Sequence, residues 1–256
     1  MTALAALTER MVLGTLRDDL PFAILAPVGN FVVFNFGLRN VINTGQMSYS
    51  QYVLPAIIIQ VMLLGALTTV DRAARDHGSD FGVRLRTLPI PAVVPLMARM
   101  LYCLFRGALA LLAAIAVGYV FGFRMVGGFV YAAAFAVLVL TLTLAVSLGA
   151  DATGARVAGA GTAGAEISSS GAASQFLLVP QLLLVMLSTG MAPANAFPDW
   201  LLPFVRYQPV SQVTETMRGL TTGHVVFSNL ATSLAWCFGL LVMFGAVAVR
   251  MQRRTQ

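Results

Sequence analysis

The run Tyr52-Val-Leu-Pro-Ala-Ile-Ile-Ile-Gln-Val-Met-Leu-Leu-Gly-Ala-Leu-Thr-Thr-Val70 carries no charge, and Asp71-Arg-Ala-Ala-Arg75 follows it at once. A helix that crosses about 30 Å of hydrocarbon needs roughly 20 mostly apolar residues. This run has that length and composition, and it is too long and continuous for the alternating strands, of about ten residues, that build a membrane barrel. It therefore predicts a transmembrane helix.

The whole chain has the same character. Hydrophobic residues make up 58% of the 256 residues and charged residues only 10%, where soluble domains have about 25% charged residues. So little charge cannot cover a globular surface, so the apolar excess must face lipid. We predict an all-α integral membrane protein with one transmembrane domain over residues 1–256. Its six spans are expected near residues 21–38, 52–70, 100–123, 126–149, 176–192 and 225–249.

The arginines set the expected direction of these spans. The chain has sixteen basic residues, all of them Arg. With the N-terminus inside, twelve fall in inner segments and four in outer segments, so the positive-inside rule puts both termini in the cytoplasm. The net charge of +6 then reflects topology and not nucleic-acid binding. Arg99 and Arg106, near the start of the third span, are expected to snorkel to the inner interface.

Residue counts exclude several functions. Without Lys there is no phosphate-binding Walker loop, so the chain does not hydrolyse ATP by that route. The two Cys and two His have no ligand spacing, so we expect no metal. A membrane enzyme acting on lipids would need a paired acid and base or a metal. The only local collection with that chemistry is Asp71, Asp76, His77 and Asp80.

Two inner features stand out. Residues 3–19 are expected to form a helix lying on the membrane, with Leu4, Leu7 and Met11 on one face; a frayed tail is the alternative. The inner loop 71–91 mixes charges with Phe81 and other apolar residues. This mixture favours a short helix that docks on a partner over a merely solvated loop.

The outer segment 188–224 has four prolines, which prevent one continuous spanning helix. Its apolar residues nevertheless do not suit a free loop. Broken helices that re-enter the outer leaflet satisfy both facts, provided that their backbone is buried in protein or faces a water-filled cavity. Residues 151–175 are mostly Ala, Gly and Ser, which fits either a flexible inner linker or extensions of the flanking spans.

The order of these features resembles the ABC-2 type permeases, and most of all the daunorubicin-resistance-type exporters. Several stretches, spread over nearly the whole chain, carry the resemblance, and the outer ones are the most specific. They are Gly14-Thr-Leu-Arg-Asp18, Arg84-Leu-Arg-Thr-Leu-Pro89, Gly118-Tyr-Val-Phe-Gly-Phe-Arg124, Leu187-Ser-Thr-Gly190, Pro198-Asp-Trp-Leu201, Gln208-Pro-Val210 and Met217-Arg-Gly-Leu220.

The resemblance implies a non-catalytic permease subunit in the bacterial cytoplasmic membrane. Two permease chains, identical or different, would pair with two copies of a separate ATPase, which would bind the ATP and Mg²⁺; this chain would bind no cofactor. The substrate would be an amphipathic lipid or drug, as in antibiotic resistance. Contact with the ATPase would fall on Arg75, Asp80, Phe81, Arg84 and Arg86, and the extracellular gate on Pro193, Pro198, Trp200 and Pro209.

Polar residues inside spans are the candidates for a transport path, in particular Asn30 and Asn35. Their alternative role is a hydrogen bond from helix to helix, which contributes about 0.6 kcal/mol and up to about 2. A polysaccharide or teichoic-acid-type exporter is the alternative function, although aromatic residues are only 9% of the chain. A membrane-embedded lipid enzyme ranks below both.

Overall fold

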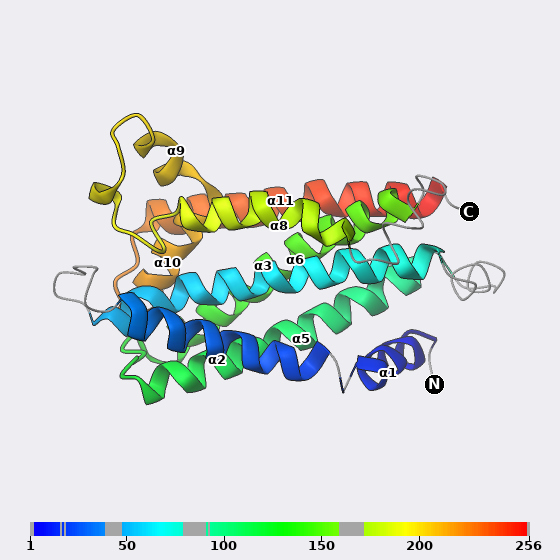
Figure 1. Cartoon of the computed structure of the whole chain (residues 1–256), viewed down its shortest axis with the longest axis horizontal. Coiled ribbons are helices and arrows are strands. Elements are labelled where there is room, and N and C mark those ends of the chain that lie inside the picture. The colour runs from blue at the N-terminus through cyan, green and yellow to red at the C-terminus, as the bar shows by residue number, and fades with distance from the viewer. Residues whose placement is uncertain are drawn as a thin grey trace.

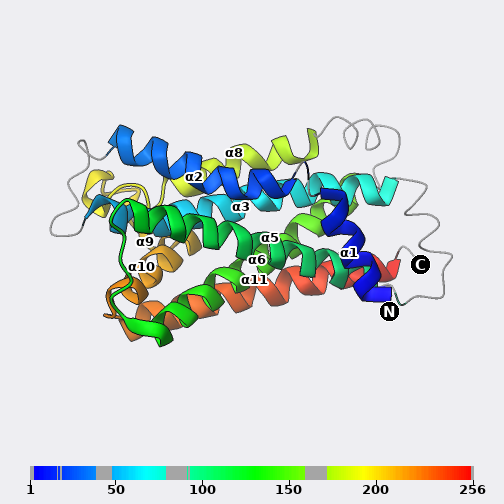
Figure 2. The same cartoon turned by 90° about the horizontal axis from the view of Figure 1, so that it is seen from below.

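The computed structural model of the chain is a bundle of long, roughly parallel helices (Figure 1; Figure 2). It describes residues 3–15, 17, 19–38, 48–78, 91, 93–158 and 172–254, and among these no strand occurs. The helices are α1 (Ala3–Thr15), α2 (Asp19–Leu38), α3 (Tyr49–Gly78), α5 (Val93–Val120), α6 (Gly128–Ala158), α8 (Ala172–Met186), α9 (Leu202–Tyr207), α10 (Pro209–Thr222) and α11 (Phe227–Arg254), with the short 3-10 helix η1 (Ala194–Ala196).

Five described helices, α2, α3, α5, α6 and α11, are long and apolar enough to cross a membrane. Helix α8 takes the place of the expected fifth span, but it has only 15 residues, or about 22 Å at 1.5 Å per residue. The N- and C-terminal ends of the chain lie at the same end of the bundle (Figure 1). Helix α8 also runs along the bundle axis, beside these five helices (Figure 1). We call the end that carries both termini the inner end and the opposite end the outer end.

Helix α3 forms the core of the bundle. The apolar window of α3 is 78% buried, whereas that of α11 is 17% buried, and α3 packs against α2, α5, α6, α8 and α10. Its residues Val53, Leu54, Ile57 and Ile58 are fully buried, which explains why its apolar run continues around the whole helix. The helices around α3 instead expose large apolar side chains such as Phe36 of α2 and Phe129 of α6. Such surfaces are expected where a helix meets lipid or another subunit.

The stretch Gly118–Arg124 ends α5 with a glycine cap. Gly122 has φ = +90°, the Phe123 N–H donates to the Gly118 carbonyl at 2.8 Å, and together these make a Schellman motif. The Ser50 hydroxyl then donates to the Phe121 carbonyl at 2.9 Å, and the Gln51 amide donates to the Arg124 carbonyl at 3.0 Å. The motif therefore fastens the end of α5 to the start of α3.

Helix α1 confirms the expected N-terminal helix, although it ends at Thr15 and α2 begins at Asp19. Half-buried residues recur along it at Leu4, Leu7, Met11 and Thr15, the spacing of a helix with one packed face. α1 lies across the inner end, against α5 and oblique to the bundle axis (Figure 2).

Three boundaries differ from the sequence-based expectation. Helix α3 continues to Gly78, so residues 71–78 of the expected inner loop are helical. Helix α5 begins at Val93, not near residue 100, and α6 continues to Ala158. Residues 151–158 thus extend a span, the second of the two possibilities left open for 151–175. Residues 159–171 lie outside the described part of the chain.

Candidate functional site

At the outer end, the side chain of Arg218 on α10 joins α3 to the turn that follows α8. Its Nε donates to the Tyr52 carbonyl at 3.0 Å, one terminal nitrogen to the Thr189 carbonyl at 3.0 Å and the other to the Gly190 carbonyl at 2.9 Å. The guanidinium carbon also lies 3.6 Å from the centre of the Tyr52 ring, within the range of a cation–π contact. We call Tyr52, Thr189, Gly190 and Arg218 the outer cluster.

The geometry of the outer cluster explains its residue types. Carbonyl groups beyond the end of α8 have no partner within the helix, and the planar fork of an Arg offers several donors in fixed directions. The Tyr52 hydroxyl donates to the same Thr189 carbonyl at 2.9 Å. Gly190 is needed for close approach, because a Cβ there would lie 2.8 Å from Ala56 Cβ. The motifs Leu187–Gly190 and Met217–Leu220 therefore meet in space.

A second set of polar residues supports this turn from α10. The Ser211 hydroxyl accepts a bond from the Thr189 N–H at 3.0 Å, and the Gln208 amide donates to the Leu187 carbonyl at 2.6 Å. The Thr189 hydroxyl donates to Glu215 at 3.3 Å. Burial lowers the pKa of the Arg218 guanidinium from its ordinary value, and Tyr52 and Glu215 partly offset that effect. Backbone and side chains thus fix one conformation of the turn.

The four predicted gate residues occupy the irregular part of the outer end. Pro193 precedes η1 with extended backbone, and Pro209 is the first residue of α10, where a missing N–H has no cost. Pro198 is exposed, and Trp200 is 79% exposed. The segment is thus broken into short helices, as its prolines predict. Its action as a gate stays a prediction.

At the inner end, three side chains from α3 and α5 meet around Asp19, the first residue of α2. Arg72 of α3 donates to one carboxylate oxygen at 3.0 Å and Arg106 of α5 to the other at 3.0 Å. The Tyr102 hydroxyl donates to Asp19 at 2.7 Å, and the Arg72 guanidinium lies 4.4 Å from the centre of the Tyr102 ring. We call Asp19, Arg72, Tyr102 and Arg106 the inner cluster.

A second ion pair joins α5 to α6, between Arg99 Nε and Asp151 Oδ1 at 2.6 Å. Asp151 is 1% exposed, Arg99 6% and Arg106 7%. The expectation that Arg99 and Arg106 snorkel to the interface is therefore wrong. Both are buried because each has a carboxylate partner, which a lone arginine in lipid lacks. In the sequence, the signal for these pairs was two arginines within an apolar segment, Arg99 and Arg106, together with acidic residues next to other apolar segments.

The predicted ATPase contacts fall mostly beyond the described residues. Arg75 is exposed near the inner end of α3, on the helical continuation that the sequence had assigned to a loop. Asp80, Phe81, Arg84 and Arg86 lie outside the part of the chain that the structure describes. Their contact with an ATPase stays a prediction.

The two predicted transport-path residues lie on α2 in different surroundings. Asn30 is partly exposed. Asn35 is 3% exposed, and its side-chain oxygen accepts a bond from the Ser50 hydroxyl at 3.4 Å. Asn35 thus faces α3, within the chain, and only Asn30 of the two is open to the surroundings.

The described residues contain no group of three or more His, Cys, Asp or Glu side chains that could hold a metal ion. Asp71 is not free for such a role, because its carboxylate accepts the Ser174 N–H at 3.1 Å. Asp80 and the side chain of His77 fall outside the description.

Comparisons with known proteins find relatives over most of the sequence. Residues 24–250 match the family model described as ABC-2 family transporter protein. The chain is 27% identical over 241 residues to a probable doxorubicin resistance ABC transporter permease protein, DrrC, of Mycobacterium tuberculosis, covering 92% of this chain and 83% of the relative. It is 30% identical over 209 residues to a doxorubicin resistance ABC transporter permease protein, DrrB, of the same organism, covering 75% of this chain and 65% of the relative.

A third relative is the daunorubicin resistance ABC transporter permease protein DrrB1 of Streptomyces coeruleorubidus, 23% identical over 230 residues, which cover 90% of this chain and 78% of the relative. The family match includes α3, α5, α6 and α8, most of α2 and α11, and both polar clusters except Asp19. The chain therefore belongs to the ABC-2 family of transporter proteins.

Proposed function

We propose that the chain is the permease subunit of an exporter that moves amphipathic drugs or lipids out of a bacterial cell, driven by a separate ATPase. The observation that carries this proposal is the family match over residues 24–250, with relatives named for doxorubicin and daunorubicin resistance. Without Lys, the chain has no Walker loop of its own, so ATP and Mg²⁺ belong to the ATPase. Both termini and the inner end then face the cytoplasm.

The mechanism that we propose uses α3 as the link between the ATPase and the outer segment. Helix α3 has 30 residues, about 45 Å at 1.5 Å per residue. Arg72 near its inner end belongs to the inner cluster and Tyr52 near its outer end to the outer cluster. A rigid, buried helix held at both ends is a physical route for coupling between distant sites.

In this mechanism, closure of the ATPases on nucleotide favours one of two permease states by making different contacts with each. The residues after Gly78 would receive this contact, and α3 would carry it to Thr189 and Gly190, from which the broken helices η1, α9 and α10 continue. A second permease, identical or different, would complete the path. The relatives named DrrB and DrrC support such a pair of related permeases.

The experiment is reconstitution of the chain in lipid vesicles, with its ATPase and second permease added or left out. We expect ATP-dependent doxorubicin export only from the complete complex, and hydrolysis that the permeases stimulate. Phe81→Ala and Arg84→Ala should lower the drug exported per ATP hydrolysed, whereas Arg156→Ala, an exposed control at the inner end of α6, should not. ATP hydrolysis by the chain alone would contradict the proposal, and export of a lipid-linked polysaccharide in place of drug would favour the alternative substrate.

A further inference from the structure

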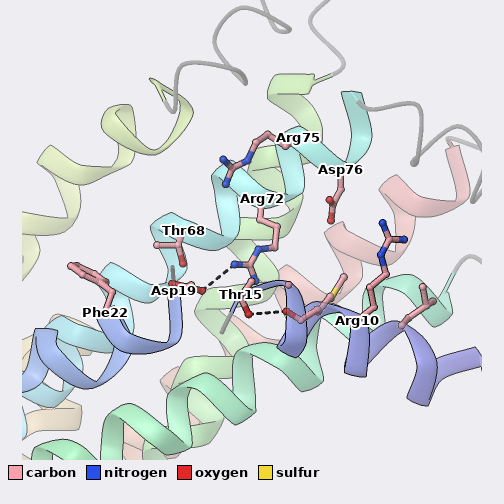
Figure 3. Close-up of a pocket in the computed structure, with 11 residues that line it drawn as sticks. Arg10, Thr15, Asp19, Phe22, Thr68, Arg72, Arg75 and Asp76 are labelled. Atoms are coloured by element: carbon pink, nitrogen blue, oxygen red, sulfur yellow. Dashed lines mark hydrogen bonds and ion pairs between the residues drawn. The ribbon is translucent and has the colours of Figure 1, made fainter. Parts of the chain in front are cut away.

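A cavity of about 680 Å³ opens at the inner end, between α1, the start of α2 and the inner part of α3 (Figure 3). Its volume lies in the usual range for small-molecule sites, about 300–1,000 Å³. One face of α1 and one face of α3 form its walls, since the lining residues repeat at helical spacing. They are Leu7, Arg10, Met11 and Gly14 on α1, and Thr68, Arg72, Arg75 and Asp76 on α3.

The cavity has a surplus of positive charge. Three arginines line it, against the two carboxylates of Asp19 and Asp76. Asp19 is already shared between Arg72 and Arg106, at 3.0 Å from each, so its charge is more than balanced. Arg75 also lines the cavity, about one turn farther along α3 toward the inner end than Arg72 (Figure 3), and it is exposed. An anion is therefore the charge type that this cavity favours.

The remaining polar groups of the lining do not recognise a neutral ligand. The Thr15 hydroxyl donates to the Met11 carbonyl at 2.7 Å, and the Thr68 hydroxyl donates to the Gly65 carbonyl at 2.9 Å. Both hydroxyl protons are thus directed into their own helices, as is common for Thr in apolar helices. The exposed guanidinium of Arg75, beside Arg72, remains as a donor in the lining, and guanidinium groups fit phosphate oxygens well.

The cavity also has an apolar side that continues onto the membrane-facing surface. Leu7, Met11 and Phe22 line it. Phe22 is 51% exposed, and Leu25, the next large residue on that exposed face of α2, is 64% exposed. A ligand that fills both parts needs an anionic head and an apolar tail.

We propose that this cavity binds an anionic phospholipid of the adjoining leaflet, with its phosphate at Arg72 and Arg75 and an acyl chain along Met11 and Phe22. The lipid would hold α1 against α3, and it is distinct from the exported substrate. The positive-inside orientation makes this the cytoplasmic leaflet, whose anionic lipids attract basic segments.

The test measures lipid bound to the purified full-length chain by native mass spectrometry, without ATPase or drug, so its result does not depend on the proposed transport function. Phosphatidylglycerol and phosphatidylcholine with the same acyl chains are titrated in turn. We expect the wild type to bind the anionic lipid about tenfold more tightly, and Arg75→Gln to remove about that factor. Arg156→Gln, at an exposed arginine of the same end, is the matched control and should bind like the wild type.

Two further measurements make the assignment specific. A phosphatidylglycerol carrying a photoreactive group on its acyl chain should label peptides that contain Met11 or Phe22, and inorganic phosphate at millimolar concentration should not displace the lipid. Equal binding by Arg75→Gln and Arg156→Gln, or labelling confined to other helices, would overturn the proposal. Full displacement by inorganic phosphate would also overturn it, because the site would then bind a free anion.

Discussion

At the outer end Arg218 donates to three backbone carbonyl oxygens, whereas at the inner end Arg72 and Arg106 share the carboxylate of Asp19. The outer arginine fixes the path of the chain beyond α8, where helix hydrogen bonds run out. The inner arginines fix the positions of three whole helices relative to one another. Loss of the Asp19 charge should therefore unfold the inner end. Replacement of the Arg218 guanidinium by a donor of different shape should instead change the conformation of the outer end.

The largest effect is expected from Asp19→Asn. It leaves the buried guanidinium group of Arg106 and the partly buried one of Arg72 without their carboxylate, and removal of one partner from a buried ion pair costs about 3–5 kcal/mol. Thermal unfolding of the purified permease in detergent measures the loss. Glu9→Gln, at an exposed acidic residue of α1, is the control and should change stability by no more than about 0.5 kcal/mol. Equal unfolding midpoints for the two variants would show that the inner cluster does not hold the helices together.

Arg218→Lys tests the geometry of the outer cluster at constant charge. A lysine ammonium cannot reach three carbonyl groups in the plane of a guanidinium, so we expect a loss of about 1–3 kcal/mol, the cost of leaving buried acceptors unpaired. Arg206→Lys on the exposed side of α9 provides the comparison. If Arg218→Lys unfolds at the same temperature as Arg206→Lys, the positive charge at position 218 is enough for stability and the geometry of the guanidinium is not needed.

The sequence predicts local features of the two ends better than it predicts contacts between distant residues. The broken outer segment follows from its prolines, because Pro193, Pro198 and Pro209 act on the local backbone. The outer cluster needs a contact between residues more than 160 positions apart in the chain, Tyr52 and Arg218, which local patterns do not specify. The motifs Leu187–Gly190 and Met217–Leu220 contain Gly190 and Arg218, but they do not indicate that these two residues are in contact.

The inner end was harder to predict, because burial of an arginine depends on a partner from another helix. Arg106 reads as a snorkelling residue when its own span is considered alone. Asp19 reads as a flanking charge and Asp151 as part of a small-residue linker. Only the fold brings each carboxylate to its arginine. The available sign in the sequence was that Asp19 and Asp151 each lie next to an apolar run. The length of the apolar runs predicted the long helices, although the ends of α3, α5 and α6 differ from the expected ones.

Close packing gives a third contrast between the two ends. Gly190→Ala puts a Cβ 2.8 Å from Ala56 Cβ, and Gly154→Ala puts one against the Val70 carbonyl oxygen, where α6 meets α3. Overpacking of this kind costs about 1–3 kcal/mol. We expect Ala56→Gly to restore part of the stability lost in Gly190→Ala, because it removes the Cβ that the new methyl group meets, while a glycine within α3 costs about 1 kcal/mol. No side-chain change relieves Gly154→Ala, which meets backbone.

Gly29→Ala serves as the control for both glycine variants, since a Cβ at Gly29 meets nothing within 4 Å. Its stability should not fall below that of the wild type. Failure of Ala56→Gly to restore Gly190→Ala in a thermal unfolding measurement would show that the two residues are not in contact.

The smallest effect on stability is expected from Trp200→Ala. This side chain is 79% exposed, so its removal should change the free energy of unfolding by no more than about 0.5 kcal/mol. If the outer segment is the gate, export by the reconstituted complex should nevertheless fall. Tyr207→Ala, another exposed aromatic residue of the outer end, is the matched variant outside the predicted gate. Equal export by both would remove Trp200 from the gate.

The central claim is that α3 joins an externally driven inner end to the outer segment. The most direct measurement is the number of drug molecules exported per ATP hydrolysed by the reconstituted complex containing Arg218→Lys. We predict that hydrolysis continues and that this ratio falls about tenfold, because the outer segment no longer follows α3. An unchanged ratio in a correctly assembled complex would contradict the account.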